Sequence, residues 1–227
     1  MLVSVVIPAY NERKTVVEVV KKVKAVRLGG LKREIIVVDD GSTDGTREVL
    51  RKLRGVKVVY HDRNLGKGAA LRSGFAHVKG DYIIVQDADL EYDPSEYPKL
   101  LETLLDGSAD VVYGSRFLGG PHRVLLFWNY VGNVFLNFVS NMLADVNLTD
   151  METGHKAFRR KVLKEVRLKS NGFEVEPEFT MKVARKGYRI YEVPISYRGR
   201  TRAEGKKITL KDGVLALFTL FRYRLFD

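Results

Sequence analysis

The chain has 227 residues, a length that suits one domain and allows a substantial hydrophobic core. It contains no cysteine, which excludes disulfide bonds and thiol chemistry. Its net charge of +11 lies in the last third, because residues 1–155 hold 20 basic and 20 acidic side chains whereas residues 156–227 hold 19 and 8. A basic end of this kind indicates an anionic partner (a phosphate, a lipid headgroup or a nucleic acid) or a solubilising surface.

Short apolar runs alternate with amphipathic stretches along most of the chain. The N-terminus has no basic leader and no long apolar run, so it predicts a first strand and not a signal peptide. Predicted strands cover residues 2–7, 34–38, 56–60, 82–85, 111–113 and 192–197, and predicted helices cover residues 12–26 (capped by Asn11), 44–53, 66–78 and 94–105. This order predicts an α/β fold with a mostly parallel sheet flanked by helices, which binds ligands beyond the carboxyl ends of its strands.

Two carboxylates, Asp87 and Asp89, follow the strand-like run at residues 82–86. Closely spaced acids at the end of a buried strand are costly unless a cation lies between them. A divalent metal ion that carries a diphosphate meets this need, since Mg²⁺ takes carboxylate oxygens together with substrate phosphates. The pair therefore predicts nucleotide-diphosphate chemistry.

Further polar clusters fall at the ends of predicted strands, at residues 8–12 and 39–44. Arg116 ends the fifth strand and suits bidentate pairing with a diphosphate. The glycines and the lysine at residues 66–68 either attract phosphate to a helix start or let that helix pack closely. The basic segment 198–207 either folds over a pyrophosphate or forms a solvated loop. Acids spaced two apart at residues 174–178 either favour a helix start or position an acceptor.

Residues 124–144 form an uncharged stretch long enough to span a membrane. Five amide and hydroxyl side chains in it fall within about 120° of helical arc, however, and a span would have to bury that stripe. The stretch therefore predicts one or two amphipathic helices whose apolar face lies on the core or in a membrane interface. The apolar run 214–221, followed by Arg222 and Arg224, predicts either a headgroup-binding helix or a docked C-terminal helix.

In combination these motifs resemble the inverting family-two glycosyltransferases with the GT-A fold, and most closely the dolichyl-phosphate mannose synthases and related polyprenyl-phosphate sugar transferases. The matching segments are residues 5–12, 37–45, 64–68, 87–89, 114–116, 153–159, 172–178 and 192–197, together with Lys206. The resemblance implies a single GT-A catalytic domain over residues 1–227. Its parts would be a nucleotide-binding half (1–115), an acceptor-binding half (116–207) and a membrane-facing amphipathic C-terminal helix (208–227).

The resemblance also implies roles for individual residues. The base and ribose would be surrounded by Pro8, Tyr10, Glu12, Val37, Asp39 and Asp40. Mg²⁺ or Mn²⁺ and the diphosphate would be held by Asp87, Ala88, Asp89 and Glu91. The phosphates would be gripped by Arg116, Arg200 and Lys206, which with Asp89 form the expected catalytic set. Glu91 replaces the glutamine of the mannose synthases, and relatives that use UDP-sugars look similar, so GDP-mannose and UDP-glucose are both expected donors.

The expected reaction moves a hexose, with mannose favoured, from a nucleotide-diphosphate sugar to a polyprenyl or dolichyl phosphate with inversion. The metal ion would neutralise the departing diphosphate. An acceptor phosphate is anionic near neutral pH, its second pKa being about 6, so it needs positioning more than a base. A sugar hydroxyl would need a base, for which Asp150, Glu176 and Glu178 are the candidates.

The expected location is the cytoplasmic face of a membrane, where the protein would be peripheral, with or without an anchoring partner. Three alternatives remain open: transfer to a saccharide or small molecule, a nucleic-acid-binding module built on the basic third, and a catalytically silent membrane-associated subunit. The acids at 87 and 89 and the cations at 116 and 206 favour an enzyme, so no nucleic-acid partner is expected.

Overall fold

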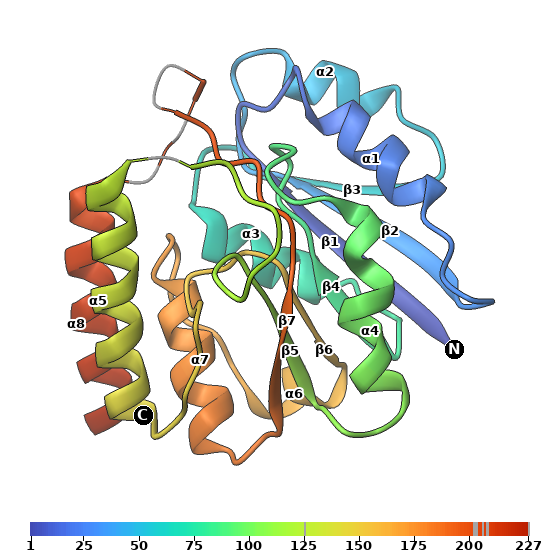
Figure 1. The fold of residues 1–227 in the computed structure, drawn as a ribbon. Coiled ribbons are helices and arrows are strands. Elements are labelled where there is room, and N and C mark those ends of the chain that lie inside the picture. The colour runs from blue at the N-terminus through green and yellow to red at the C-terminus, as the bar shows by residue number, and fades with distance from the viewer. Residues whose placement is uncertain (125, 202–203, 206, 208, 227) are drawn as a thin grey trace.

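A computed structural model of the chain describes residues 1–227 except 125, 202–203, 206, 208 and 227. Its centre is a seven-stranded sheet with the order β3-β2-β1-β4-β6-β5-β7 (Figure 1). The strands are β1 (Leu2–Ala9), β2 (Lys32–Asp39), β3 (Lys57–Tyr60), β4 (Tyr82–Val85), β5 (Val111–Ser115), β6 (Lys156–Arg159) and β7 (Ile190–Pro194). Neighbouring strands are parallel except where β6 pairs with β4 and β5. The predicted mostly parallel α/β sheet is confirmed.

Helices cover both faces of this sheet (Figure 1). One face packs against α1 (Val16–Ala25), α2 (Thr46–Arg51) and α4 (Tyr97–Leu105), the last preceded by the short 3₁₀ helix η1 (Pro94–Glu96). The other face packs against α3 (Lys67–Phe75), α6 (Lys161–Glu165) and α7 (Val175–Arg185). Side chains alternate between the two cores along β1, with Val5 in the first and Val6 in the second, as the pleat of a strand requires.

Two local predictions are wrong. Asn11 does not cap α1, which begins four residues later than predicted; its backbone is left-handed (φ 53°) and its side-chain oxygen accepts the N–H of Thr43, so it joins two loops instead. The last strand ends at Pro194, which lacks an N–H, and not at Tyr197, which forms only isolated bridges.

The two remaining helices, α5 (Phe127–Ala144) and α8 (Leu210–Leu225), lie side by side beyond α7, at one edge of the molecule (Figure 1). They pack on α7 and on each other through a third apolar cluster: Val139, Met151, Met181, Leu220 and Tyr223. Their outer sides expose many large apolar side chains, which are considered below. Among the described residues, no helix combines the length and the hydropathy that crossing a bilayer requires.

Candidate functional site

The predicted polar clusters meet at the carboxyl edge of the sheet. β1 pairs with β2 on one side and with β4 on the other, and Ala9 lies opposite Asp39 in the register. The loops that follow these three parallel strands therefore begin next to one another. Two of these loops carry Glu12 and the pair Asp87 and Asp89, and Asp39 ends β2, so three acidic segments that are distant in sequence meet at one edge of the sheet.

The two acids at the end of β2 have different partners. Asp39 is fully buried, and its carboxylate accepts a hydrogen bond of 2.7 Å from Nε of Arg47. Asp40 accepts the backbone N–H groups of residues 65 and 66 at 2.9 and 2.8 Å, and lies 2.7 Å from Nδ1 of His61. Asp40 thus holds the loop before α3 in place, whereas Asp39 with Arg47 stands beside the site. The sequence alone did not single out Arg47, because it lies inside α2.

Asp87 is held by Lys67, the first residue of α3. The ammonium nitrogen lies 2.9 and 3.0 Å from the two carboxylate oxygens of Asp87, and 3.1 Å from Glu176. Burial opposes the charge, but the two carboxylates raise the pKa of Lys67 far above its usual value, so it stays a cation. A Cβ on Gly154 would lie 2.3 Å from Asp87 and 2.8 Å from the ammonium, so a larger residue there would displace this ion pair. Lys67 therefore links Asp87 to Glu176 of α7.

Asp89 and Glu91 converge on the guanidinium of Arg200. Nη2 of Arg200 lies 2.9 Å from Asp89 and 3.2 Å from Glu12, while Nε lies 3.3 Å from Glu91. The backbone N–H of Arg200 also donates to Glu91 at 2.8 Å. Lys207 adds a second cation, 2.7 Å from Glu12. Arg200 and Lys207, from the basic segment after β7, thus cover the acidic edge, and Lys206 lies outside the described residues.

A strained turn sets these two acids side by side. Leu90, between them, has a left-handed backbone (φ 65°), which is rare for a bulky residue. The N–H of Glu91 donates to the side chain of Asp89 at 3.1 Å and closes the turn. Strain of this kind persists only where the surroundings impose it, and it concentrates at functional sites.

The clustered negative charges around Asp89 and Glu91 favour an added cation. Burial, and then the negative charges of Asp87 and Glu91, raise the pKa of Asp89 to about 7, and Arg200 only partly compensates. Carboxylate oxygens are the ligands that Mg²⁺ and Mn²⁺ prefer. Among the described side chains no three acids or histidines form a ready metal centre, and both Asp89 and Glu91 are paired with Arg200. The donor set itself suits a hard divalent cation.

Arg116 is fixed at the end of β5 by Asp150. Its Nε and Nη2 each lie 2.7 Å from a different oxygen of Asp150, and its backbone N–H donates to the same carboxylate at 2.9 Å. The guanidinium also lies over the rings of Phe117 and Tyr197, 5.4 and 5.1 Å from their centres. Asp150 thereby orients the arginine, and both of its carboxylate oxygens are engaged by that one residue.

The segment that carries Asp150 is bound by the amide stripe of α5. Asn137 donates to the carbonyl of Leu148 at 2.5 Å and accepts the N–H of Met151 at 2.9 Å. Asn141 makes two further hydrogen bonds with Leu148. The stripe therefore faces the protein, and the apolar side of α5 faces outward. The helix and the arginine of the site are linked through one short segment.

The other acceptor candidates are also engaged. Glu176 is ion-paired with Lys67 and with Lys156, and Glu178 accepts the N–H groups of residues 169 and 170, both at 2.7 Å. The structure does not bring these acids together with Asp150. It instead reveals Glu152, whose Oε1 is buried and whose pKa is raised to about 7 by burial and by Glu176. Nothing in the sequence marked Glu152 except its place two residues after Asp150.

The remaining predicted residues line the strands. Pro8 lies near the end of β1, Ala88 is buried between the two acids, and Val37 is buried in the core of β2, where its side chain packs toward α1. Tyr10 follows β1, and the ammonium of Lys207 lies 5.6 Å from the centre of its ring. These positions surround the acidic edge. Because the side chain of Val37 is buried in the core, only its backbone is available to a ligand.

The sequence of this chain is similar to those of known proteins. A family model described as Glycosyl transferase family 2 matches residues 4–167. The chain is 34% identical to a dolichol-phosphate mannosyltransferase of Pyrococcus furiosus, over 99% of this chain and 64% of that protein. It is 30% identical to the glycosyltransferase AglJ of Haloferax volcanii, over 97% of this chain and 71% of that protein. The chain thus spans somewhat less than two thirds of the first relative.

Solved structures share the fold. Glucosyl-3-phosphoglycerate synthase from Mycobacterium tuberculosis, in complex with Mn²⁺, uridine diphosphate and phosphoglyceric acid, superposes with a TM-score of 0.79 at 23% identity, covering 100% of this chain and 79% of that one. A second structure of the same enzyme holds Mg²⁺ and uridine diphosphate, with a TM-score of 0.75. The GT-A arrangement of sheet and helices predicted from the sequence is confirmed.

Proposed function

Since this chain belongs to glycosyl transferase family 2, we propose that it transfers a hexose from a nucleotide-diphosphate sugar to a polyprenyl (dolichyl-type) phosphate, with inversion. The observation that supports this acceptor most strongly is the link from α5 to Arg116. α5 exposes an apolar face and binds, through Asn137, the segment whose Asp150 orients that arginine. A lipid lying on α5 would bring its phosphate toward a cation already positioned for it.

The donor would occupy the carboxyl edge of β1, β2 and β4. Tyr10 and Asp39, with Arg47, would contact the base and ribose, alongside Pro8, Glu12, Val37 and Asp40. Asp89 and Glu91, with Asp87 beside them, would hold Mg²⁺ or Mn²⁺, which when bound supplies positive charge to the departing diphosphate. The phosphates would be held by Arg116, Arg200 and Lys206. The mannosyltransferase from Pyrococcus favours mannose, so GDP-mannose is the first donor to test, and the Mycobacterium enzyme makes UDP-glucose the second.

The acceptor phosphate needs orientation and not deprotonation. A phosphate monoester carries a negative charge at neutral pH, and the three acids expected as bases are all paired with cations or backbone groups. Asp150 binds Nε and Nη2 of Arg116 and fixes the guanidinium, so the arginine would orient such an anion through its remaining N–H groups and its charge. The chain's own contribution would then be positioning, charge compensation and exclusion of water.

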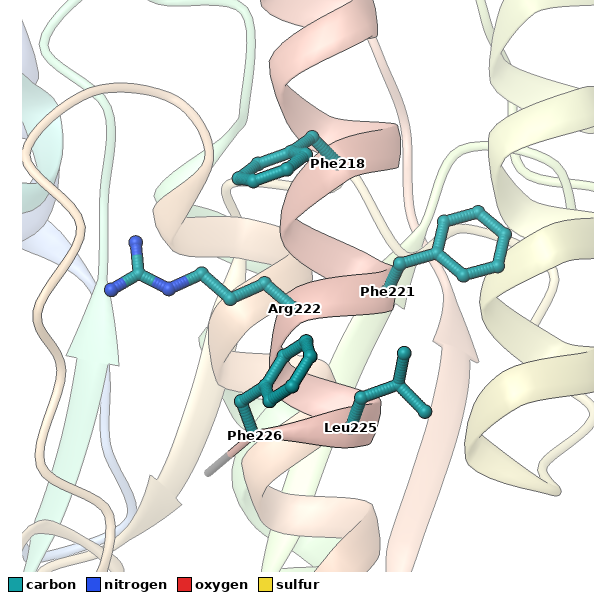
Figure 2. Close-up of a pocket in the computed structure, with 5 residues that line it drawn as sticks. All are labelled: Phe218, Phe221, Arg222, Leu225 and Phe226. Carbon is teal, nitrogen blue, oxygen red and sulfur yellow. The ribbon is translucent and has the colours of Figure 1, made fainter.

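The apolar surface formed by α5 and α8 is proposed to contact the membrane. We define it by its exposed side chains: Leu126, Phe127, Trp128, Val131, Val134, Phe135, Phe138 and Met142 of the first helix and its approach, and Leu210, Val214, Leu215, Phe218, Phe221, Leu225 and Phe226 of the second. Contiguous exposed apolar surface of this extent marks an interaction site. Figure 2 shows Phe218 and Phe226 beside Arg222, around a hollow of about 330 Å³, the mixture of aromatic and basic groups that suits a headgroup zone.

This surface makes a peripheral position on the cytoplasmic face of a membrane the proposed location. Within the single catalytic domain, residues 1–115 would bind the nucleotide, residues 116–207 the acceptor, and residues 208–227 the membrane. An anchoring partner would meet the same two helices.

Trp128 is the sole tryptophan of the chain and 78% exposed, so its emission should shift to shorter wavelength when anionic vesicles are added.

The experiment that tests the proposed acceptor is radiolabelled transfer. GDP-[¹⁴C]mannose and UDP-[¹⁴C]glucose are each incubated with the protein, Mn²⁺ and one of three acceptors: polyprenyl phosphate in vesicles, phosphoglyceric acid, or soluble saccharides. Label is expected in the lipid fraction with one donor. Label in a soluble product, with none in the lipid, would refute the proposed acceptor while leaving the family intact.

A saccharide acceptor is the second candidate, and Glu152 is the observation that favours it. A carboxyl whose pKa is about 7 suits a general base at neutral pH. If a sugar hydroxyl is the acceptor, Glu152→Gln should abolish transfer, whereas transfer to an already ionised phosphate should survive the change.

A further inference from the structure

Arg200 makes the most concentrated set of charged contacts at the site. Its guanidinium meets three carboxylates from two different loops, those of Glu12, Asp89 and Glu91, within 3.3 Å. Its side chain is only 18% exposed. Two of the three acids, Asp89 and Glu91, are the same ones that would hold the divalent cation under the proposed function. The guanidinium of Arg200 is therefore paired with two carboxylates that would coordinate the divalent metal ion.

Glu91 binds the loop of Arg200 at several points. One of its carboxylate oxygens accepts the hydroxyl of Tyr197 at 2.8 Å, and the other accepts the backbone N–H of Arg200 at 2.8 Å. Its backbone carbonyl accepts the N–H of Arg198 at 3.0 Å. The loop therefore closes over the acids through bonds that do not involve the guanidinium, which can change partners while the loop stays in place.

We propose that Arg200 acts as the resident counter-cation of the metal-binding acids, and that a divalent cation enters only together with a nucleotide diphosphate. This inference rests on the proposed metal-dependent donor site. A metal ion alone would have to displace the guanidinium from Asp89 and Glu91 and leave it partly buried without those partners, which is costly. When a diphosphate arrives with the metal, the acids exchange the arginine for the metal ion and the arginine exchanges the acids for phosphate oxygens, so no charge is left unpaired.

The consequence is an order of binding set by one side chain. Without nucleotide, Arg200 should exclude Mn²⁺ from the site; with nucleotide, it should help to retain the diphosphate. Removing its charge should therefore strengthen the binding of the bare metal while weakening the binding of the nucleotide. A residue that served only the fold would not produce these opposite changes.

Mn²⁺ titration followed by the electron paramagnetic resonance signal of the free ion tests this directly. The wild type, Arg200→Met and the control Arg198→Met are titrated without nucleotide and with UDP or GDP, against blanks of nucleotide alone. Arg198 is the matched control, because it lies on the same loop, carries the same charge and is exposed. Arg200→Met is expected to bind Mn²⁺ alone about tenfold more tightly than the wild type and the control.

Equal binding of Mn²⁺ alone by the wild type and Arg200→Met, with equal melting temperatures, would overturn the exchange and leave the metal-dependent function standing. Arg200→Lys, which keeps the charge but loses the fork, should fall between the two and guards against a folding defect of the first variant. If none of the proteins bound Mn²⁺ even with either nucleotide, the metal site itself, and with it the proposed metal-dependent transfer, would be refuted.

Discussion

Asp89 is the acid of the site whose negative charge is least compensated by neighbouring cations. Its neighbours Asp87 and Glu91 are both acids, and its own carboxyl is buried, so its pKa is raised to about 7. Asp87 has a permanent cation in Lys67, whereas Asp89 shares Arg200 with two other acids. The two acids of the pair are therefore not equivalent, and Asp89 has the greater need for a divalent cation.

Asp89→Asn should abolish transfer while leaving the fold intact. The amide keeps the shape of the side chain but removes the charge that would bind the metal ion, so kcat should fall by about 100-fold or more. The melting temperature should not fall, because one of three crowded acids has been neutralised. Asp93→Asn is the control: Asp93 accepts the N–H of Ser95 at the start of η1, a role that asparagine also performs, so that variant should keep full activity. Retained turnover in Asp89→Asn would contradict the assignment.

His155 makes stability depend on pH. It is fully buried, stacked on Tyr92 with ring centres 5.3 Å apart, and burial lowers its pKa to about 4. Because the unfolded chain takes up the proton near pH 6.5, the stabilisation is complete above that pH and is lost as the pH falls toward 4. Between pH 7 and pH 5 this histidine should account for about 2 kcal/mol of lost stability.

Urea unfolding of the wild type and His155→Gln at pH 7 and pH 5 measures that dependence. Whatever the absolute stability of the variant, the difference between its free energies of unfolding at the two pH values should be about 2 kcal/mol smaller than for the wild type. An identical pH dependence of the two proteins would show that the histidine is not held neutral.

The sequence predicted the types of residue at this site better than their pairing. Acids at the end of a strand, an arginine at the end of the fifth strand and a basic loop after the last strand are local patterns, and they led to the predictions for Asp89, Arg116 and Arg200 respectively. Partners that come from distant segments left no such pattern. Lys67 was visible as a helix-start lysine but not as the partner of Asp87, and Arg47 and Glu152 were not visible at all, because burial and pKa are properties of the folded chain.

Among the helices, α5 departs most from the usual pattern of a surface helix. Its amide side chains face the protein and its aromatic side chains face outward, the reverse of a surface helix in a globular domain. The amides satisfy backbone groups of residues 148–151, which would otherwise lack partners. The helix thereby fixes the position of Asp150 and, through it, of Arg116.

Asn137→Leu should loosen that segment. The change removes a donor to Leu148 and an acceptor from Met151, so stability should fall by about 1–3 kcal/mol. The KM values for the donor and the acceptor should both rise, because Arg116 loses its orientation. Asn133→Leu is the matched control: it lies one turn earlier and, among the described residues, its amide donates only to Asn129 of the same helix. Equal effects of both variants would show that the contact with residues 148–151 does not matter.

Most of the elements were predictable because they depend on local periodicity. β4 was predicted with the observed bounds, and α3 and α5 were predicted over longer ranges than they occupy. The start of α1 was misplaced because Asn11 adopts a left-handed backbone to reach the loop after β2, a tertiary contact. The antiparallel β6 was not predicted either, since only the pairing with β4 and β5 distinguishes its short run from a loop.

At the scale of the whole molecule, charge and apolar surface are separated. The acidic edge of the sheet is covered by Arg200 and Lys207, whereas the exposed apolar side chains belong to α5 and α8, which lie side by side at one edge of the molecule (Figure 1). A surplus of basic residues in the last third had suggested several anionic partners. Under the proposed function the anionic partner is a phosphate attached to a lipid, and one segment, residues 148–151, joins the apolar helix to the arginine of the site.

The most direct test of this account compares a long-chain polyprenyl phosphate in vesicles with a short, water-soluble isoprenyl phosphate as acceptors. The variant is Phe138→Ser/Phe218→Ser, which removes two side chains of the apolar surface that are each 64% exposed, and the control is Leu105→Ser, an exposed position at the end of α4. The account predicts that the double variant loses about tenfold or more in kcat/KM with the lipid in vesicles and keeps its rate with the soluble acceptor. Equal rates of the double variant and the wild type on vesicles, or an equal loss with both acceptors, would contradict it.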